Sequence, residues 1–397
     1  MKHELGISVY PDLRSLQEIE AYFQLASRYG VTRVFSSMFS VEGSKEEVFD
    51  YFQQLIEAAH RYQLKVSLDV NPMCFEKMEA SPEDLSVFDQ LHVDILRMDL
   101  SYGPVLDAKL VQNPYGIVIE FNNSVEIVQG LLDQGVDPSS FLVCHNFYPQ
   151  RYTAMKWNTF IEKNKEIKAC SSSVRIGAFI SSNVEDSHGV WGAENGLPTV
   201  ERLRFLPIDL QARMLLATGH VDDLLIGNAF ASESEFQSLQ EVLSEPEVSL
   251  DSLDPVLQML VQYGIVDLTK PLKKLRLCLE EEITTSEREA LFDFYPHLDM
   301  GDSSEWIWRT RISRFKYSQP SETIPYRSYD KEMFAVGDVV IVNDRYKHYA
   351  GEIQIVKKPI VNDGTRNLLG HIDEEEYQMV ELIEDGDLVQ FLEKEGI

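Results

Sequence analysis

The sequence predicts an α/β protein: a (β/α)8 barrel of the TIM type, followed by a small all-β barrel domain. Three observations support this prediction. Short β-branched runs alternate with amphipathic helical stretches over the first two thirds of the chain. These runs recur eight times, mostly about 25–35 residues apart, as expected for βα repeats. After about residue 305 the pattern changes to strands separated by turns.

The repeats can be assigned one by one. The helix after the first strand carries an apolar stripe from Leu16 to Ala26, and Gly30 follows it as a stop signal. A doubly wound open sheet is the competing architecture, but eight repeats and no glycine-rich turn after the first strand favour the closed barrel. The eight expected strands are Leu5–Tyr10, Arg33–Ser37, Lys65–Val70, Ile95–Asp99, Ile117–Asn122, Phe141–Asn146, Arg175–Ser181 and Asp223–Asn228.

Three segments are expected along the chain: the barrel at 1–245, a helical or mixed connecting segment at 246–305, and the all-β domain at 306–397. Turns such as Asn362-Asp363-Gly364 separate the strands of the last segment. Two helical stretches are expected near the boundary, at Glu235–Leu243 and Leu253–Tyr263. The strands expected in the all-β domain are Val339–Asn343, Glu352–Val356, Asn367–Ile372 and Gln378–Leu382.

Composition excludes several classes of partner. The chain has 397 residues, with 36 Lys plus Arg against 65 Asp plus Glu, a formal net charge of -29. Nucleic acids and anionic membranes bind through clustered positive charge, so neither is an expected partner. The four cysteines are widely spaced and form no CxxC pair, and the first residues are too polar for a signal peptide, so we expect a cytoplasmic protein with reduced thiols. A homo-oligomer is compatible with the sequence.

Polar side chains stand at the carboxyl end of every expected strand, where barrel enzymes place their active sites. Asp69, Asp99 and Glu120 are three carboxylates that could divide the roles of acid and of nucleophile or base, as glycoside hydrolysis requires. For each carboxylate the alternative is a helix cap or a partner for Arg97, and for His145 a satisfied core histidine. The side chains expected to bind a sugar are Tyr10, Asn122, His145, Asn146, Tyr148, Ser181, Asn183 and Asn228.

Other chemistries fit this rim less well. No lysine lies at a strand end for a Schiff base, and His145 is the only histidine at a strand end, so neither a cofactor nor a metal is expected. GxGxxG and GxxxxGK[ST] loops are absent, which removes the usual nucleotide sites. No GxSxG elbow supports a serine nucleophile.

Several segments, taken in order, resemble the bacterial 6-phospho-N-acetylmuramidases. The resemblance covers nearly the whole chain, and the His-Asn-Phe-Tyr-Pro run is its most specific part. The matching segments are Gly6-Ile7-Ser8-Val9-Tyr10-Pro11, Leu96-Arg97-Met98-Asp99, Asn113-Pro114-Tyr115, Cys144-His145-Asn146-Phe147-Tyr148-Pro149, Gly196-Leu197-Pro198-Thr199, Gly337-Asp338-Val339-Val340-Ile341, Gly351-Glu352-Ile353-Gln354-Ile355 and Arg366-Asn367-Leu368-Leu369-Gly370.

The resemblance implies a TIM-like barrel and a cyclophilin-like β-barrel. It also implies a cell-wall recycling enzyme that hydrolyses 6-phospho-N-acetylmuramyl-N-acetylglucosamine to N-acetylmuramic acid 6-phosphate and N-acetylglucosamine. Two positions depart from the family pattern: Asn228 stands where Asp is usual, and Leu100-Ser101-Tyr102-Gly103 replaces an aromatic-Gly pair. If Asn228 replaces a functional carboxylate, activity or substrate preference differs.

The substrate phosphate requires cationic or amide donors. Barrels often bind phosphate near strands seven and eight, which favours Arg175 with Ser181, Ser182 and Asn183. The all-β domain offers a second set, namely Arg311, Arg314, Arg345, Tyr346, His348 and Arg366. Two other functions stay open: a phosphosugar-binding protein without activity, for which Asn228 is the argument, and a phosphosugar isomerase or epimerase that uses Glu120 and His145.

Overall fold

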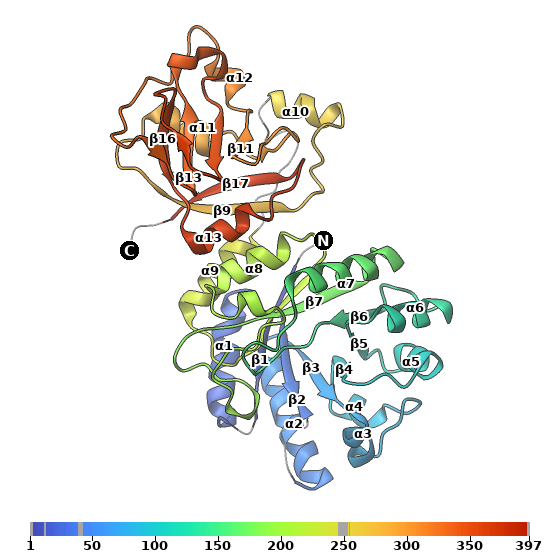
Figure 1. The fold of residues 1–397 in the computed structure, drawn as a ribbon. Helices are drawn as coiled ribbons and strands as arrows, with labels where there is room; N and C mark the ends of the chain where they lie inside the picture. The colour runs from blue at the N-terminus through green and yellow to red at the C-terminus, as the bar shows by residue number, and fades with distance from the viewer. Residues whose placement is uncertain (1–2, 12, 39–42, 245–252, 254, 395–397) are drawn as a thin grey trace. The chain divides into compact units, whose positions relative to one another are not determined.

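The computed structural model describes residues 3–11, 13–38, 43–244, 253 and 255–394. The chain forms two compact units (Figure 1). The first contains the described residues up to 244 except 217–219, and the second contains 217–219 and the described residues after 244. No helix in these described ranges is long and apolar enough to cross a membrane. All four cysteines are free thiols.

The first unit is a closed barrel of eight parallel strands in sequential order, with β1 pairing with both β2 and β8. This confirms the predicted fold class, and each predicted strand begins and ends within two residues of the observed one. The strands are β1 Glu4–Val9, β2 Arg33–Ser37, β3 Lys65–Val70, β4 Ile95–Met98, β5 Val118–Asn122, β6 Phe141–Cys144, β7 Arg175–Ile180 and β8 Asp223–Ile226.

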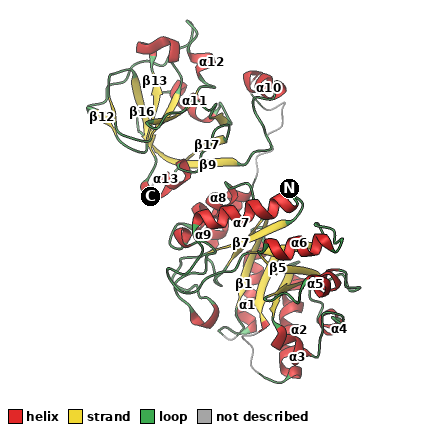
Figure 2. Cartoon of the chain, turned by 45° about the vertical axis from the view of Figure 1, so that its right-hand side comes forward, coloured by secondary structure: helices red, strands yellow, loops and turns green. Residues whose placement is uncertain are grey.

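Helices surround the strands on the outside (Figure 2). Several begin with a reciprocal capping box, such as Ser15 with Glu18 in the first helix, which satisfies two backbone donors and contributes about 1 kcal/mol. That helix ends before Gly30, whose φ of +80° only glycine adopts without strain. The helices are α1 Leu16–Arg28, α2 Lys45–Arg61, α3 Pro72–Met78, α4 Ser86–Gln90, α5 Pro104–Val111, α6 Val125–Asp133, α7 Trp157–Cys170, α8 Ile208–Leu216 and α9 Glu233–Leu243.

The inside of the barrel is divided into an apolar and a polar part. Side chains alternate between the two faces of a strand, so every second residue points inward. One part is a hydrophobic cluster that includes two residues of the loop after β7, Val190 and Leu197; its other members are Tyr10, Phe35, Cys144, Phe179, Leu225 and Ala229. The polar part lies along β2 to β5, where charged side chains replace apolar ones at inward positions.

The second unit contains a seven-stranded sheet in the order β10-β17-β9-β16-β13-β14-β11. Its two edge strands approach one another, because the Leu298 amide donates to Thr310 Oγ1 at 3.3 Å, so the sheet is a nearly closed barrel. The strands are β9 Leu272–Leu279, β10 His297–Leu298, β11 Ile307–Thr310, β13 Asp338–Val342, β14 Ile353–Val356, β16 Arg366–His371 and β17 Leu388–Glu393, with β12 Met333–Phe334 and β15 Ile360–Val361 as a separate pair. The helices are α10 Pro255–Gln262, α11 Thr285–Phe292, α12 Arg314–Tyr317 and α13 Glu374–Val380.

Two expectations about the second half differ from the structure. The predicted strand Gln378–Leu382 is wrong, because most of it lies in helix α13, which begins after Asp373 and buries Glu376, Met379 and Val380. Spacings of three and four between buried positions fit a helical period, and Glu374–Glu376 place negative charge at the helix start, where the dipole favours it. The described part of the expected connecting segment 246–305 contributes β9 and β10 to the sheet and therefore belongs to the second unit.

Candidate active site at the carboxyl ends of strands β3 to β6

A chain of alternating charges runs along the inside of the barrel. Glu120 lies between two arginines: its Oε2 accepts from Arg33 Nη2 at 2.6 Å, and its Oε1 lies 3.5 Å from Arg97 Nε. Arg97 in turn donates from Nη1 to Asp69 Oδ1 at 2.9 Å. Glu120 is 1% exposed and Asp69 7% exposed, so the chain runs from the deep interior to the rim. Each buried charge is paired, as burial in a low-dielectric interior requires.

Asp69 and Asp99 are the two carboxylates that this arrangement places at the rim. Asp69 is the penultimate residue of β3, and Asp99 directly follows the adjacent parallel strand β4. Asp99 is half-buried. Burial raises the pKa of Asp69 to about 6, although Arg97 opposes the shift, and the negative charges of Asp99 and Glu120 add to it. A carboxyl group whose pKa is raised toward neutrality is suited to act as a general acid.

Arg97 also holds two amide side chains at this rim. Its Nη2 donates to Asn122 Oδ1 at 2.8 Å and to Asn146 Oδ1 at 2.5 Å. Asn122 Nδ2 donates to the Asp99 backbone oxygen at 2.7 Å, which fixes the end of β4. The planar guanidinium therefore organises one acid and two amides from three other strand ends, a task for which the compact ammonium of lysine lacks the forked geometry. These contacts bring together four of the predicted site residues, namely Asp69, Asp99, Asn122 and Asn146.

The loops after β6 and β7 are fastened to one another beside this rim. Arg204, 1% exposed, donates to the backbone oxygens of Tyr148, Gln150, Asn195 and Gly196. It also pairs with Glu201, and this hydrogen bond is the main reason that the pKa of Glu201 falls to about 2. The predicted residue Tyr148 thus lies in a rigid loop, and its side chain is half-buried.

His145 does not face the barrel interior. It follows Cys144, which points inward, so its own side chain points to the helix layer, where Nε2 lies 2.6 Å from Asn164 Oδ1 and the ring packs on Phe160. Burial lowers the pKa of His145 to about 4. It is a neutral, satisfied core histidine, which was the alternative interpretation of the sequence.

Four further predicted residues have structural partners. Tyr10 is buried in the apolar cluster and donates to the Gly227 oxygen at 2.5 Å. Ser181 Oγ accepts from the Leu197 amide at 2.8 Å. Asn183 Nδ2 donates to the Leu206 oxygen. Asn228, 2% exposed, accepts from the Ser182 amide and donates to the Ser182 oxygen and to Ser187 Oγ.

The bonds of Asn228 give a physical reason for the amide at this position. Ser182 both donates to Asn228 and accepts from it, and only an amide matches both halves of that backbone group. An aspartate would face the Ser182 oxygen with a second acceptor. The departure from the family pattern therefore coincides with a buried structural hydrogen bond.

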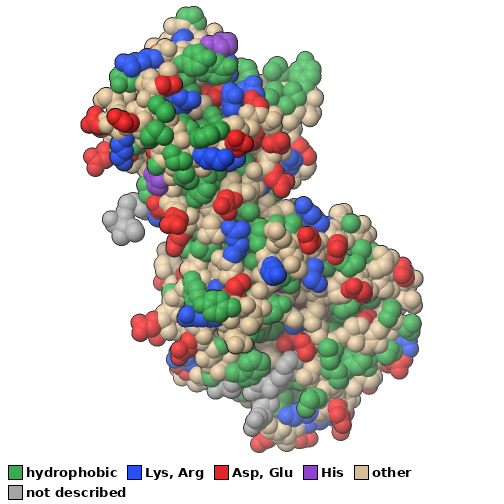
Figure 3. Space-filling model, in the orientation of Figure 1, with side chains coloured by type: hydrophobic (Ala, Val, Ile, Leu, Met, Phe, Trp, Pro, Cys, Tyr) green, Lys and Arg blue, Asp and Glu red, His purple; other side chains and the backbone are tan. Residues whose placement is uncertain are grey.

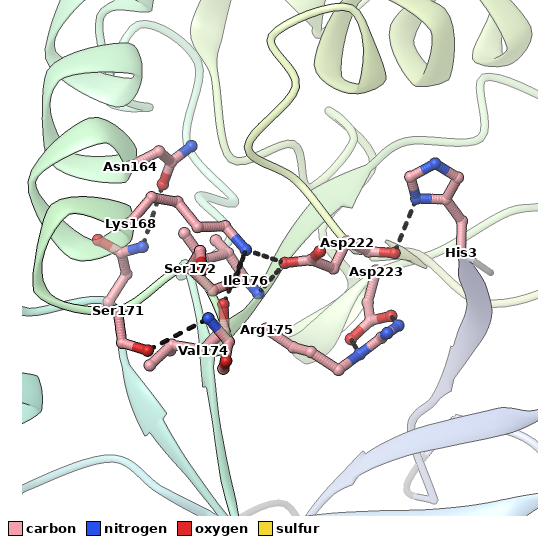
Figure 4. Close-up of polar contacts among 12 residues, drawn as sticks. His3, Asn164, Lys168, Ser171, Ser172, Val174, Arg175, Ile176, Asp222 and Asp223 are labelled. Atoms are coloured by element: carbon pink, nitrogen blue, oxygen red, sulfur yellow. Dashed lines mark hydrogen bonds and ion pairs between the residues drawn. The ribbon is translucent and has the colours of Figure 1, made fainter. Parts of the chain in front are cut away.

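Arg175 lies at the other end of the barrel. It is the first residue of β7, whereas the rim is reached at Ile180, and its guanidinium pairs with Asp223 at the start of β8 (Figure 4). Next to it, Lys168 pairs with Asp222 at 2.8 Å. The structure therefore corrects the assignment of Arg175 to the phosphate, because an amino-terminal strand position cannot reach the carboxyl-terminal rim.

Two predicted residues belong to the second unit. Arg366 Nε donates to Gln354 Oε1 at 2.8 Å, and Gln354 donates to Glu352, which also pairs with Arg309. Tyr346 is 52% exposed. Their contact with a phosphate stays a prediction. On the face shown in Figure 3, acidic and basic side chains are interspersed over both units.

Sequence reasoning undervalued Arg97 and did not consider Arg33. The signal was present: an arginine inside a short β-branched strand must be buried, and a buried arginine needs carboxylates at matching inward positions on its neighbours. Asp69, Arg97 and Glu120 occupy such matching positions in the register.

Among the residues that the structure describes, no three His, Cys, Asp or Glu side chains gather as metal ligands.

Comparisons with known proteins agree with this architecture. Residues 5–241 match the family described as 6-phospho-N-acetylmuramidase, N-terminal, and residues 273–392 match 6-phospho-N-acetylmuramidase, C-terminal. The crystal structure of an uncharacterized B. cereus protein is similar, with a TM-score of 0.80 and 30% identity over 99% of this chain and 100% of that one. A conserved Enterococcus faecalis protein of unknown function gives a TM-score of 0.64 at 20% identity, over 99% and 97% of the two chains. No curated protein matched the sequence.

Both family matches together span nearly the whole chain, and they fall on the barrel and on the second unit respectively. The family name is that of a glycosidase. The chain belongs to the 6-phospho-N-acetylmuramidase family.

Proposed function

We propose that this chain is a cytoplasmic glycoside hydrolase of cell-wall recycling. Its substrate is 6-phospho-N-acetylmuramyl-N-acetylglucosamine, and its products are N-acetylmuramic acid 6-phosphate and N-acetylglucosamine. Family membership supports the substrate class. The observation that carries the proposal is the pair of rim carboxylates, Asp69 and Asp99, which stand at the ends of adjacent strands and lie in different environments.

The two environments suggest the two roles. Asp69 is buried, its pKa is raised to about 6, and it therefore suits the acid that protonates the leaving oxygen. Asp99 is the more exposed of the two and suits the nucleophile or the base that activates water. Glu120, which the sequence placed with these two, is enclosed by Arg33 and Arg97 and serves better as their counterion.

The isomerase alternative loses its support. It relied on Glu120 and His145. Glu120 lies deep inside the barrel, and His145 points away from the barrel interior and packs against helix α7. The binding-protein alternative relied on Asn228, whose amide is used in the bonds to Ser182 and Ser187.

The test is cleavage of the phosphorylated muramyl disaccharide, followed by mass spectrometry of the products. We expect Asp69→Asn and Asp99→Asn each to reduce kcat by at least a hundredfold, while Asp50→Asn, on an exposed position of α2, leaves it unchanged. Binding of the disaccharide without turnover by the wild-type protein would instead support a binding protein. Unchanged cleavage by both rim variants would refute the site.

A further inference from the structure

Arg97 determines which way two rim amides face. An arginine side chain has donors only, so each asparagine that bonds to it must present its oxygen. Asn122 and Asn146 both place Oδ1 on Arg97 Nη2, at 2.8 and 2.5 Å. Their Nδ2 groups consequently point away from Arg97, and the orientation of both amides is fixed by chemistry.

The two amides then differ in what is left for a ligand. Asn122 Nδ2 already donates to the backbone oxygen of Asp99. Asn146 is exposed, and no residue in the described part of the chain accepts a hydrogen bond from its Nδ2. Because Asn146 and Asp69 share the guanidinium of Arg97, this donor is held in the immediate surroundings of the candidate acid.

A fixed N–H donor next to the acid binds an acceptor oxygen of the substrate. If Asp69 protonates the glycosidic oxygen on C1 of the muramyl sugar, the closest substituent of that sugar is the acetamido group on C2, and the lactyl ether on C3 comes next. The acetamido carbonyl and the lactyl carboxylate both present oxygens that accept hydrogen bonds and carry no hydrogen. A free ammonium at the acetamido position would offer only donors and would face Asn146 Nδ2 without a partner.

We propose that Asn146 is a specificity-determining residue whose Nδ2 binds a carbonyl or carboxylate oxygen of the muramyl sugar, with Arg97 as the positioning residue that orients it. The inference rests on the proposed function, because it takes the sugar at the rim to be the one that is cleaved. The acetamido carbonyl and the lactyl carboxylate are the two sources of this acceptor.

The discriminating variant is Asn146→Asp. An aspartate keeps an acceptor for Arg97 Nη2, so the rim keeps its structure, but it removes the donor. Asn146→Ala removes both, and Asn158→Ala, at an exposed position of α7, is the matched control. Thermal unfolding of each variant tells a lost donor from a lost fold.

Binding is measured calorimetrically, so that the test does not depend on turnover. The ligands are N-acetylmuramic acid 6-phosphate, its deacetylated amine, and N-acetylglucosamine 6-phosphate, which lacks the lactyl ether. We expect Asn146→Asp to weaken binding of the first ligand at least tenfold, and not to weaken binding of the ligand that lacks the acceptor used. If only the amine escapes the loss, the acceptor is the acetamido carbonyl, and an aspartate can even strengthen binding of its ammonium. If only the third ligand escapes the loss, the acceptor is the lactyl carboxylate.

Three results would overturn the inference: the same loss on all three ligands, no loss on any, or no binding of any ligand by the wild-type protein. Failure of the proposed function would give a different result. The product assay would then show no cleavage, while the calorimetric binding experiment would still report the selectivity among the three ligands.

Discussion

Replacing Glu120 with glutamine removes the negative charge that lies between Arg33 and Arg97 while keeping the size of the side chain. The three side chains are 1%, 3% and 4% exposed, so solvent cannot replace the lost charge. Breaking a buried pair by neutralising one partner costs about 3–5 kcal/mol. Glutamine keeps one acceptor oxygen, so we expect the free energy of unfolding to fall by the lower value of this range, ~3 kcal/mol. For a barrel of this size that loss corresponds to a fall in Tm of roughly 6–12 °C.

The assay is thermal unfolding followed by circular dichroism, together with cleavage measured well below the midpoint of the variant. We expect a large fall in Tm and a smaller loss of kcat than in Asp69→Asn, because Glu120 supports Arg97 and does not touch the substrate. Glu46→Gln, at an exposed position of α2, is the control and should change neither value. A variant with unchanged Tm and no cleavage would refute this reasoning and return Glu120 to the catalytic set.

The remaining predictions concern four other residues. With Asp69 as the acid, kcat/KM falls as pH rises through about 6, and a pH–rate profile without this fall would exclude Asp69 as the acid. The raised pKa of Asp69 also stabilises the fold: this contribution is complete below pH 3.8 and is lost as pH rises through about 6. His145 has a lowered pKa of about 4, so its contribution to stability is present above pH 6.5 and is lost as pH falls toward 4; His145→Gln should reduce that acid dependence in chemical denaturation and leave kcat within a few-fold. Arg204→Lys keeps the charge but loses several bonds to loop carbonyls, and we expect it to raise KM and to increase proteolytic cleavage in the loops after β6 and β7, which limited proteolysis checks. Asn228→Asp should lower stability by about 2–4 kcal/mol without raising activity, because it puts a carboxylate against the Ser182 oxygen; a more active variant would show that the amide weakens the enzyme.

The sequence determined the barrel, because its signals are local. Alternation, helical stripes and stop residues such as Gly30 depend only on nearby positions, and eight consecutive βα repeats leave few ways to close a sheet. The helix Glu374–Val380 was missed, because a short amphipathic stretch near turns fits the period of a strand as well as that of a helix. Packing against the sheet determines which of the two forms.

The candidate site was predicted in part for the same reason. That strand ends converge follows from the topology, so Asp69, Asp99, Asn122 and Asn146 were found from the sequence. Which of the polar residues face the mouth depends on the inward or outward parity of each strand and on its register with its neighbours. His145 and Asn146 are adjacent in sequence, yet one packs on α7 and the other bonds to Arg97.

The sequence by itself determined the fold and the fact that the strand ends converge at one end of the barrel, because periodicity is written in consecutive positions. Only the tertiary structure decided what each of them does. It enclosed Glu120 between two arginines, buried Asp69 enough to raise its pKa, and oriented the Asn146 amide so that its Nδ2 donor points away from Arg97. These properties arise from burial and from charges on other strands, and no single stretch of the chain contains them.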